Sequence, residues 1–328
     1  MIETVHPRVI VKVPASTANL GPGFDTLGMA LSLYAWIEMS ASEKTEITLY
    51  GSGMSGIPTD KSNLIYKVAQ QVFQEVGVSI PELRIGMYSD IPLTRGLGSS
   101  ASAIVGALAA ANHLTGSKLS QDRLLQIATK LEGHPDNVGA SLMGGIIVSA
   151  WDGERAEAIR LEPHPDLEVL VAIPDFQLST DKARHALPES YTKQDAVYNV
   201  GRSSLLVAAL ASGELGMIRH AMKDRLHQPY RASLIPGMEQ ILAEATEYGA
   251  LGAALSGAGP TMLALVDRRS RRKQELEQFL LTSLQHQHSG AEARWLVPCL
   301  EGPVITVPDS SEDDITLMEW IKGDITAC

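Results

Sequence analysis

The stretch RGLGSSASAIVGALAAAN, residues 95–112, places two glycines and two adjacent serines directly before a run of small apolar residues. This pattern predicts a flexible loop that leads straight into the first turn of a helix. The first N–H groups of a helix lack partners within the helix, and the helix dipole adds partial positive charge at that end. A loop of this kind can therefore seat an anion, most commonly a phosphate.

The loop alone leaves two interpretations open. The segment GLGSSAS, residues 96–102, lacks the Lys followed by Ser or Thr of the Walker A pattern, and it is not a G-x-G-x-x-G dinucleotide-binding pattern. A tight strand-to-helix turn packed against its neighbours would explain the glycines about as well as a phosphate site does. Other segments of the sequence must decide between them.

Composition narrows the class of protein. The chain has 328 residues, of which 45% are hydrophobic, and this is enough for one large domain or two smaller ones. A composition change at residues 162–174 places the expected domain boundary near residue 160. The net charge of -11 argues against a nucleic-acid partner or an anionic membrane surface. Residues 101–111 are too short to cross a bilayer, and the N-terminus lacks the apolar core of a signal peptide, so we expect a cytoplasmic protein.

Periodicity predicts a mixture of strands and helices. Strands are expected at residues 8–15, 31–40, 45–51, 83–93, 144–153 and, after the domain boundary, from 167. Helices are expected directly after the glycine-rich loop and within residues 61–77, 120–133, 193–212, 236–248 and 271–285. Residues 249–267 predict two strands joined by a tight turn, residues 16–28 a region of turns, and the region after residue 303 a short helix at most.

Two further segments identify the family that the loop resembles. PASTANLGPGFDTLG, residues 14–28, and LSGAGPTMLAL, residues 255–265, flank the loop in the order found in the GHMP kinases, which are small-molecule kinases. The P-x-x-x-G-L-G-S-S-A signature of that family is matched by Pro92, Gly96, Leu97, Gly98, Ser99, Ser100 and Ala101. The resemblance covers about residues 8–305.

This resemblance implies an α+β fold of two domains and a tail. Residues 1–160 would form a ribosomal-protein-S5-like domain that binds ATP, and residues 161–305 a ferredoxin-like domain. Residues 306–328 would be a C-terminal tail. The active site would lie in the cleft between the domains, where ligand sites are common. The partners implied are small molecules, and a homodimer is compatible with the resemblance.

Three more segments resemble the branch of the family that phosphorylates the side-chain hydroxyl of L-homoserine. They are EGHPDNVGASLMGG at residues 132–145, LSTDKARHALP at 178–188 and PYRASLIPG at 229–237. One departure is Gly139-Ala140, where that branch usually has Ala-Pro, and we expect it to change local rigidity more than chemistry. Two other functions stay open at this point: a kinase for another small alcohol such as mevalonate, and a non-catalytic nucleotide-binding sensor.

For the nucleotide, the resemblance implies that Arg95 and the loop Gly96–Ser100 wrap the triphosphate with backbone N–H groups. It places the adenine near Ser62 and Asn63. Magnesium prefers hard oxygen ligands, which Ser100 and Glu132 would supply. Taken alone, Glu132 could be an ordinary solvated carboxylate, although the C-terminal end of a helix is an unfavourable place for one.

For the acceptor, the resemblance implies a pocket that holds a zwitterion bearing a hydroxyl. Arg184 and Arg231 would bind the carboxylate, since the planar guanidinium matches it bidentately. Asp25 would bind the ammonium group, although an aspartate in a turn can also simply bond its own backbone. Asp136 is expected to be catalytic, either as general base or by positioning, and Asn137 to hold the hydroxyl. The remaining expected lining residues are Asn19, His134, Thr180, Gly257 and Gly259.

Overall fold

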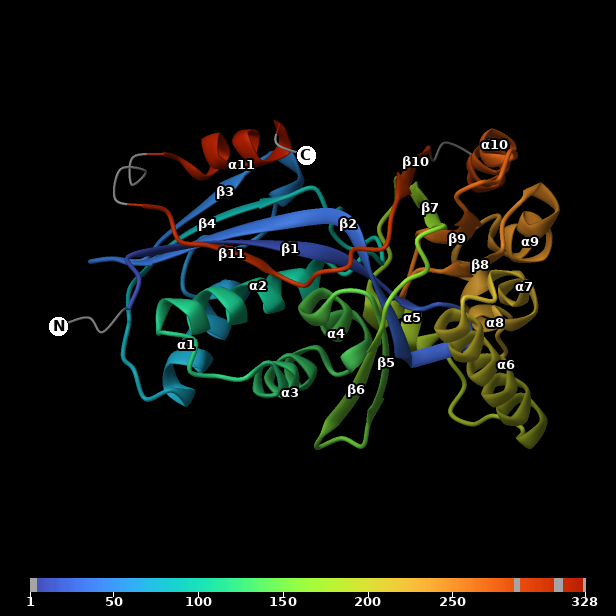
Figure 1. Ribbon diagram of the computed structural model, residues 1–328, viewed down its shortest axis with the longest axis horizontal. Helices are drawn as coiled ribbons and strands as arrows, with labels where there is room; N and C mark the ends of the chain where they lie inside the picture. Colours follow the sequence, from blue (N-terminus) through green and yellow to red (C-terminus); the bar gives the residue numbers. More distant parts are fainter. Residues whose placement is uncertain (1–4, 286–289, 310–314, 327–328) are drawn as a thin grey trace.

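The computed structural model describes residues 5–285, 290–309 and 315–326, which form two helix-covered β-sheets side by side (Figure 1). Strands of the large sheet lie in the order β11-β1-β2-β4-β3, and β5 and β6 extend it from β2. These strands are β1 (Arg8–Asn19), β2 (Gly23–Ala41), β3 (Glu46–Tyr50), β4 (Leu83–Ser89), β5 (Ile146–Trp151), β6 (Ala156–Leu161) and β11 (Val304–Thr306). All pairings in this sheet are antiparallel except β3 with β4, which α1 connects.

Helices cover both faces of the large sheet (Figure 1). One face carries α1 (Leu64–Glu75), α2 (Ser99–Leu114), α3 (Gln121–Glu132) and α4 (Pro135–Met143), and the other carries α11 (Leu317–Thr326). Side chains alternate along a strand, so Val9, Val11 and Val13 of β1 pack among the first group of helices. Ile10 points the other way and packs with Trp36 beneath α11. The expected helix in the tail is therefore present, and it covers the sheet.

Helix α2 is buried on nearly all sides, which explains its small residues. Twelve of its sixteen residues are buried. A Cβ at Gly106 would lie 2.4 Å from Cδ1 of Ile37, so the helix approaches the sheet too closely there for any side chain. The burial holds the N-terminus of α2 in a fixed place.

The small sheet has the strand order β10-β7-β9-β8, all antiparallel. Its strands are β7 (Leu167–Pro174), β8 (Gly252–Leu255), β9 (Met262–Asp267) and β10 (Ala291–Leu296). The helices of this half are α5 (Thr180–His185), α6 (Lys193–Ser212), α7 (Ile218–Ala221), α8 (Gln228–Arg231), α9 (Met238–Glu244) and α10 (Lys273–Leu284). Short 3-10 segments are η1 (Ser52–Met54), η2 (Leu215–Met217), η3 (Ala232–Leu234) and η4 (Ala245–Tyr248). No helix of the described residues is long and apolar enough to span a membrane.

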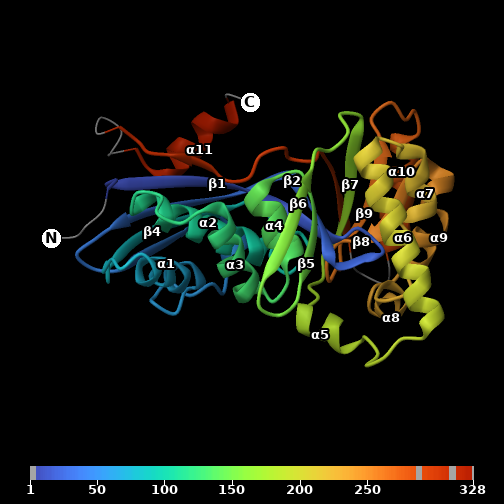
Figure 2. The ribbon, with the colours of Figure 1, turned by 60° about the horizontal axis from the view of Figure 1, so that its bottom comes forward.

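The two halves share one hydrophobic cluster. Leu27 and Met29 of β2 pack there with Val171 of β7 and Leu206 of α6, and all four are fully buried. The ends of β1 and β2 are thus fixed against the second half. Figure 2 places α5 at this junction, where the two halves meet.

Two local expectations need correction. Residues 16–28 were expected to be turns, but β1 continues to Asn19 and β2 begins at Gly23. The turn formers permit positive φ within this segment, at Asn19 (72°) and Asp25 (55°), while pairing of β1 with β2 keeps the rest extended. The tail helix is also longer than expected, because α11 has ten residues. The mixture of strands and helices confirms the α+β class.

Candidate active site

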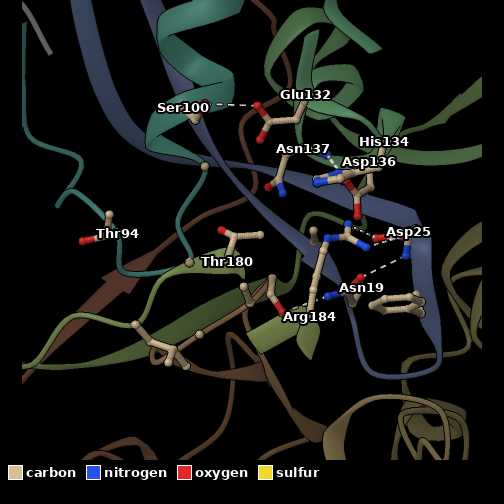
Figure 3. Close-up of a pocket in the computed structure, with 18 of the residues that line it drawn as sticks. Asn19, Asp25, Thr94, Ser100, Glu132, His134, Asp136, Asn137, Thr180 and Arg184 are labelled. Atoms are coloured by element: carbon tan, nitrogen blue, oxygen red, sulfur yellow. Dashed lines mark hydrogen bonds and ion pairs between the residues drawn. The ribbon is translucent and has the colours of Figure 1, made fainter. Parts of the chain in front are cut away.

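A cavity of about 130 Å³ lies between the two halves and collects most of the predicted site. It is lined by Gly96, Gly98, Ser99, Ser100, Glu132, His134, Asp136, Asn137, Asn19, Asp25, Thr180, Arg184, Arg231, Gly257 and Gly259. Segments more than two hundred residues apart in the sequence therefore meet here. Figure 3 shows how the polar side chains lie around this space.

The glycine loop, residues 94–98, needs its glycines for conformation and for space. Gly96 and Gly98 have φ values of 78° and 71°, in the left-handed region that favours glycine. A Cβ at Gly96 would lie 2.3 Å from the backbone oxygen of Ser256, and one at Gly98 would lie 2.1 Å from Oγ of Ser16. Backbone thus packs against backbone on both sides of the loop.

Hydrogen bonds from both halves hold the glycine loop. The amide of Ser16 donates to the oxygen of Leu97 at 3.3 Å, and the amide of Thr261 donates to the oxygen of Arg95 at 3.3 Å. Oγ of Ser256 donates to the oxygen of Gly96 at 2.6 Å. The loop is therefore shaped before any ligand binds.

Arg95 takes part in this scaffold through its side chain. Its guanidinium donates to the backbone oxygens of Pro174, at 2.9 Å, and Asp175, at 2.5 Å, at the end of β7. Pro92, Arg95, Leu97 and Ala101 do not line the cavity, and Leu97 and Ala101 are fully buried. Their positions fit a role in shaping the loop.

The N-terminus of α2 faces the cavity at Ser99 and Ser100. Gly98 is the N-cap residue and carries no side chain to occupy the free N–H groups, and the first turn has no acidic residue. The sixteen-residue helix thus presents unpartnered donors and the positive end of its dipole to the cavity. These features suit a phosphate group.

Ser100 and Glu132 form a pair of oxygen donors beside this helix end (Figure 3). Oγ of Ser100 donates to Oε2 of Glu132 at 3.1 Å. Burial raises the pKa of the Glu132 carboxyl above its ordinary value, and His134 and the Ser100 hydrogen bond only partly oppose this. A partly exposed carboxylate next to a hydroxyl offers the hard ligands that a magnesium ion accepts, so the residues present fit that ion.

The HPDN segment begins a helix, so its polar residues are held rigidly. His134 is the N-cap of α4, Pro135 occupies the first helical position, and Asp136 lies in the first turn. A Cβ at Gly28 would lie 2.1 Å from the backbone oxygen of Asp136, which shows how closely β2 approaches this turn. This helix was missing from the predicted elements, although the His-Pro-Asp order is a signal for a helix start.

Asp136 is buried, and the hydrogen bonds that it accepts within the described residues all go to one of its two carboxylate oxygens. Its Oδ1 accepts from Nδ1 of His134 at 2.5 Å and from the amide of Asn137 at 2.7 Å. Burial alone would lower the pKa of His134, but the hydrogen bond to Asp136 and the surrounding carboxylates outweigh it and raise that pKa. Oδ1 of Asn137 accepts from Oγ of Ser16 at 3.0 Å. Within the described residues, Nδ2 of Asn137 and Oδ2 of Asp136 have no partner, so both remain available to a ligand.

Asp25, Arg184 and Arg231 line one part of the cavity, and we call this cluster the acceptor clamp after the role that the resemblance implies. Nη1 and Nη2 of Arg184 donate to the two carboxylate oxygens of Asp25, at 3.1 and 2.9 Å (Figure 3). Oδ1 of Asn19 accepts from the amide of Asp25 at 3.0 Å, and Nδ2 of Asn19 donates to the oxygen of Gly257 at 2.9 Å. The clamp thus joins β2, α5 and α8.

Arg231 is the largest fully buried side chain of the described residues, with 2% of its surface exposed. Its Nε donates to the oxygen of Ala183 at 3.0 Å, and its Nη1 donates to the oxygen of Gly257 at 3.2 Å. His227 accepts from Nη1 through its Nδ1 and donates through Nε2 to the oxygen of Gly21, as its neutral tautomer allows. Burial and the nearby Arg184 lower the pKa of Arg231 to about 10, so it stays a cation at neutral pH.

Ser62 and Asn63 lie outside the cavity. Asn63 caps α1 by accepting from the amide of Ile65, and Ser62 donates to Asp60. A separate apolar recess of about 50 Å³ opens beside Ser99, and it is lined mainly by Ala35, Ile37, Met54, Ile57, Met87, Leu93 and Ala103. Asn63 lies behind this recess, with its Nδ2 3.9 Å from Sδ of Met87.

Sequence reasoning missed several lining residues of the cavity. Phe24 contributes a ring whose centroid is 5.3 Å from the guanidinium carbon of Arg231 and 5.7 Å from that of Arg184. Thr94, Leu178, Ala18 and Ala258 also line the cavity. Phe24 could have been suspected from its place beside Asp25, whereas the others have no local signal that distinguishes them.

The chain matches two family models. One, GHMP kinases N terminal domain, matches residues 63–145, and the other, GHMP kinases C terminal, matches residues 206–280. A homoserine kinase of Moorella thermoacetica is 44% identical over 296 residues, which cover 90% of this chain and 99% of that protein. A homoserine kinase of Carboxydothermus hydrogenoformans is 48% identical over 78% of this chain and 84% of that protein. The crystal structure of homoserine kinase from Cytophaga hutchinsonii has a TM-score of 0.83 and 26% identity, and covers 93% of this chain and 99% of that one.

Proposed function

This chain belongs to the homoserine kinases of the GHMP kinase family, and we propose that it transfers the γ-phosphate of ATP to the side-chain hydroxyl of L-homoserine. The products are O-phospho-L-homoserine and ADP, on the route to threonine. One observation supports this most directly: a single cavity combines a helix N-terminus suited to phosphate with groups of both charges suited to an α-amino acid.

On the nucleotide side, the amides of the glycine loop and the first turn of α2 would bind the polyphosphate. Ser99 borders both the cavity and the apolar recess, so we assign the recess to the adenine base and Asn63 to its support. Ser100 and Glu132 would hold a magnesium ion. When bound, that ion supplies charge neutralisation for the phosphates.

On the acceptor side, Arg231 and Arg184 would bind the carboxylate of homoserine and Asp25 its ammonium group. Nδ2 of Asn137 would donate to the hydroxyl oxygen and so orient it toward the phosphate seat. Oδ2 of Asp136 has no hydrogen-bond partner in the described part of the chain and would be open to the hydroxyl proton, while Oδ1 is held by His134 and the amide of Asn137. A loose transition state demands little of a base, so positioning by Asp136 and Asn137 would account for most of their effect.

The test is an ADP-release assay with ATP and Mg²⁺ on four acceptors: L-homoserine, mevalonate, shikimate and galactose. We expect turnover with homoserine and background rates with the other three, because only homoserine carries an ammonium group for Asp25. Turnover that favours mevalonate would show that the acceptor is wrong while the kinase is right. Absence of ADP release with all four, in protein that binds ATP, would favour a sensor.

A further inference from the structure

Asp25 and Arg184, which the proposed function assigns to opposite charges of the substrate, bind each other. Their two hydrogen bonds, at 2.9 and 3.1 Å, form a bidentate ion pair across the cavity, from β2 to α5. The side chains are 34% and 38% exposed, so a ligand can reach both. Each group is thus occupied by the other before substrate arrives.

Arg231 differs, because one of its nitrogens is available. Its Nε and Nη1 are committed to Ala183, Gly257 and His227, whereas Nη2 has no hydrogen-bond partner in the described part of the chain. The residue lines the cavity although it is almost wholly buried. Arg231 is therefore a preformed anchor for one carboxylate oxygen.

The charges around the cavity make the ion pair select between ligands. A carboxylate without an ammonium group can bind Arg184 only by displacing Asp25, which then loses its guanidinium partner and stays beside the carboxylate of Asp136 and the imidazole of His134. An uncompensated charge in a partly buried site is costly. A zwitterion avoids this, since its ammonium group takes Asp25 while its carboxylate takes Arg184 together with Nη2 of Arg231.

We propose that the Asp25–Arg184 ion pair is an exchangeable gate that admits α-amino acids as zwitterions and rejects hydroxy acids that lack the ammonium group. This inference rests on the proposed function and deepens it. The gate adds selectivity because Asp25 competes with the carboxylate of a ligand for Arg184. This effect comes in addition to the direct contact between Asp25 and an ammonium group.

The decisive comparison uses L-homoserine and 4-hydroxybutanoate, which differ only in the ammonium group. In Asp25→Asn we expect kcat/KM for homoserine to fall about 100-fold, as for loss of one partner of a desolvated charge pair. For 4-hydroxybutanoate we expect kcat/KM to rise about 10-fold, because Arg184 is released to bind the carboxylate. Simple ammonium binding, without exchange, would leave 4-hydroxybutanoate unchanged and would overturn the inference.

The same substitution in a second protein variant, Arg184→Gln, separates exchange of the ion pair from simple repulsion between Asp25 and an anionic ligand. In Arg184→Gln, adding Asp25→Asn should give no gain with 4-hydroxybutanoate, because the released partner is missing. A gain of the same size in that background would mean that Asp25 merely repels anions, and the gate would be rejected. Asp181→Asn is the matched control for Asp25→Asn, since Asp181 lies on the same helix as Arg184 but has an 86% exposed side chain. It should leave the ratio of the two substrates unchanged, and thermal unfolding should show that every variant is folded.

Wild-type turnover keeps the two proposals apart. If wild-type protein does not phosphorylate homoserine, the proposed function fails before the gate is tested. If it does so, and the substrate ratio fails to shift in Asp25→Asn, only the gate fails.

Discussion

The glycine loop and the acceptor clamp lie in one cavity but are held in opposite ways. Backbone amides and carbonyls of both halves fix the loop, and the side chain of Arg95 donates its hydrogen bonds to the carbonyls of Pro174 and Asp175. In the clamp, charged side chains contact each other, as in the pair of Asp25 with Arg184. A phosphate bound by the loop would therefore require little rearrangement of it, whereas the proposed binding of the acceptor would require Asp25 and Arg184 to exchange partners.

This difference separates the effects that we expect from substitutions. Changes in the clamp should alter acceptor affinity and selectivity, because its side chains are the ligands themselves. Changes in the loop should alter stability first, because its glycines are required by neighbouring backbone. Glu132 contacts Ser100 of α2 and also faces His134. A substitution at Glu132 therefore tests whether the loop and the clamp can be changed independently of each other.

The largest effect is expected for Glu132→Gln, which keeps the shape and removes the charge. We expect kcat to fall about 10³-fold, or about 4 kcal/mol, because the anionic ligand for magnesium is lost. The KM for homoserine should change less than about 3-fold, since the clamp is untouched. Steady-state kinetics over a range of Mg²⁺ concentrations measures both values.

Glu132→Asp is the control, because it keeps the charge and should retain more activity at high Mg²⁺. Full activity in Glu132→Gln would remove this residue from the metal site. An equal rise in the KM for homoserine would show that the loop and the clamp share one electrostatic unit.

A smaller effect is expected for Arg231→Ala. The KM for homoserine should rise about 100-fold, or about 2.7 kcal/mol, because the preformed carboxylate anchor is lost, while the KM for ATP should stay within about 3-fold. Arg231→Lys keeps the charge without the planar fork and should recover only part of this loss. Equal rises for homoserine and ATP would contradict the assignment of Arg231 to the acceptor.

The same contrast explains what the sequence could predict. The glycine loop and the start of α2 were predictable because spacing and residue type are local signals. The helix that begins at Pro135 was not predicted, although a proline followed by an aspartate is an equally local signal. The prediction of turns at residues 16–28 was wrong, because pairing between β1 and β2 overrides the local preference of these residues for turns.

The clamp could be predicted only through a family resemblance. Asp25 and Arg184 are 159 residues apart, and no periodicity connects them. Their direct pairing could not be predicted, since a sequence motif indicates which residues bind the substrate but not what these residues contact when the substrate is absent. The strands β10 and β11 were missed for a similar reason, because each is short and owes its shape to a distant partner strand.

The smallest of the three effects is expected for Gly96→Ala, and it tests the loop directly. The substitution should lower the free energy of unfolding by about 2 kcal/mol, because a Cβ with positive φ is strained and would also lie 2.3 Å from the oxygen of Ser256. Gly77→Ala is the matched control, since Gly77 has a φ of 72° and open space around it. It should lose only the conformational part, about 1 kcal/mol. Urea unfolding measures both, and equal losses would mean that Ser256 does not confine the loop, so that loop and clamp would no longer differ in rigidity.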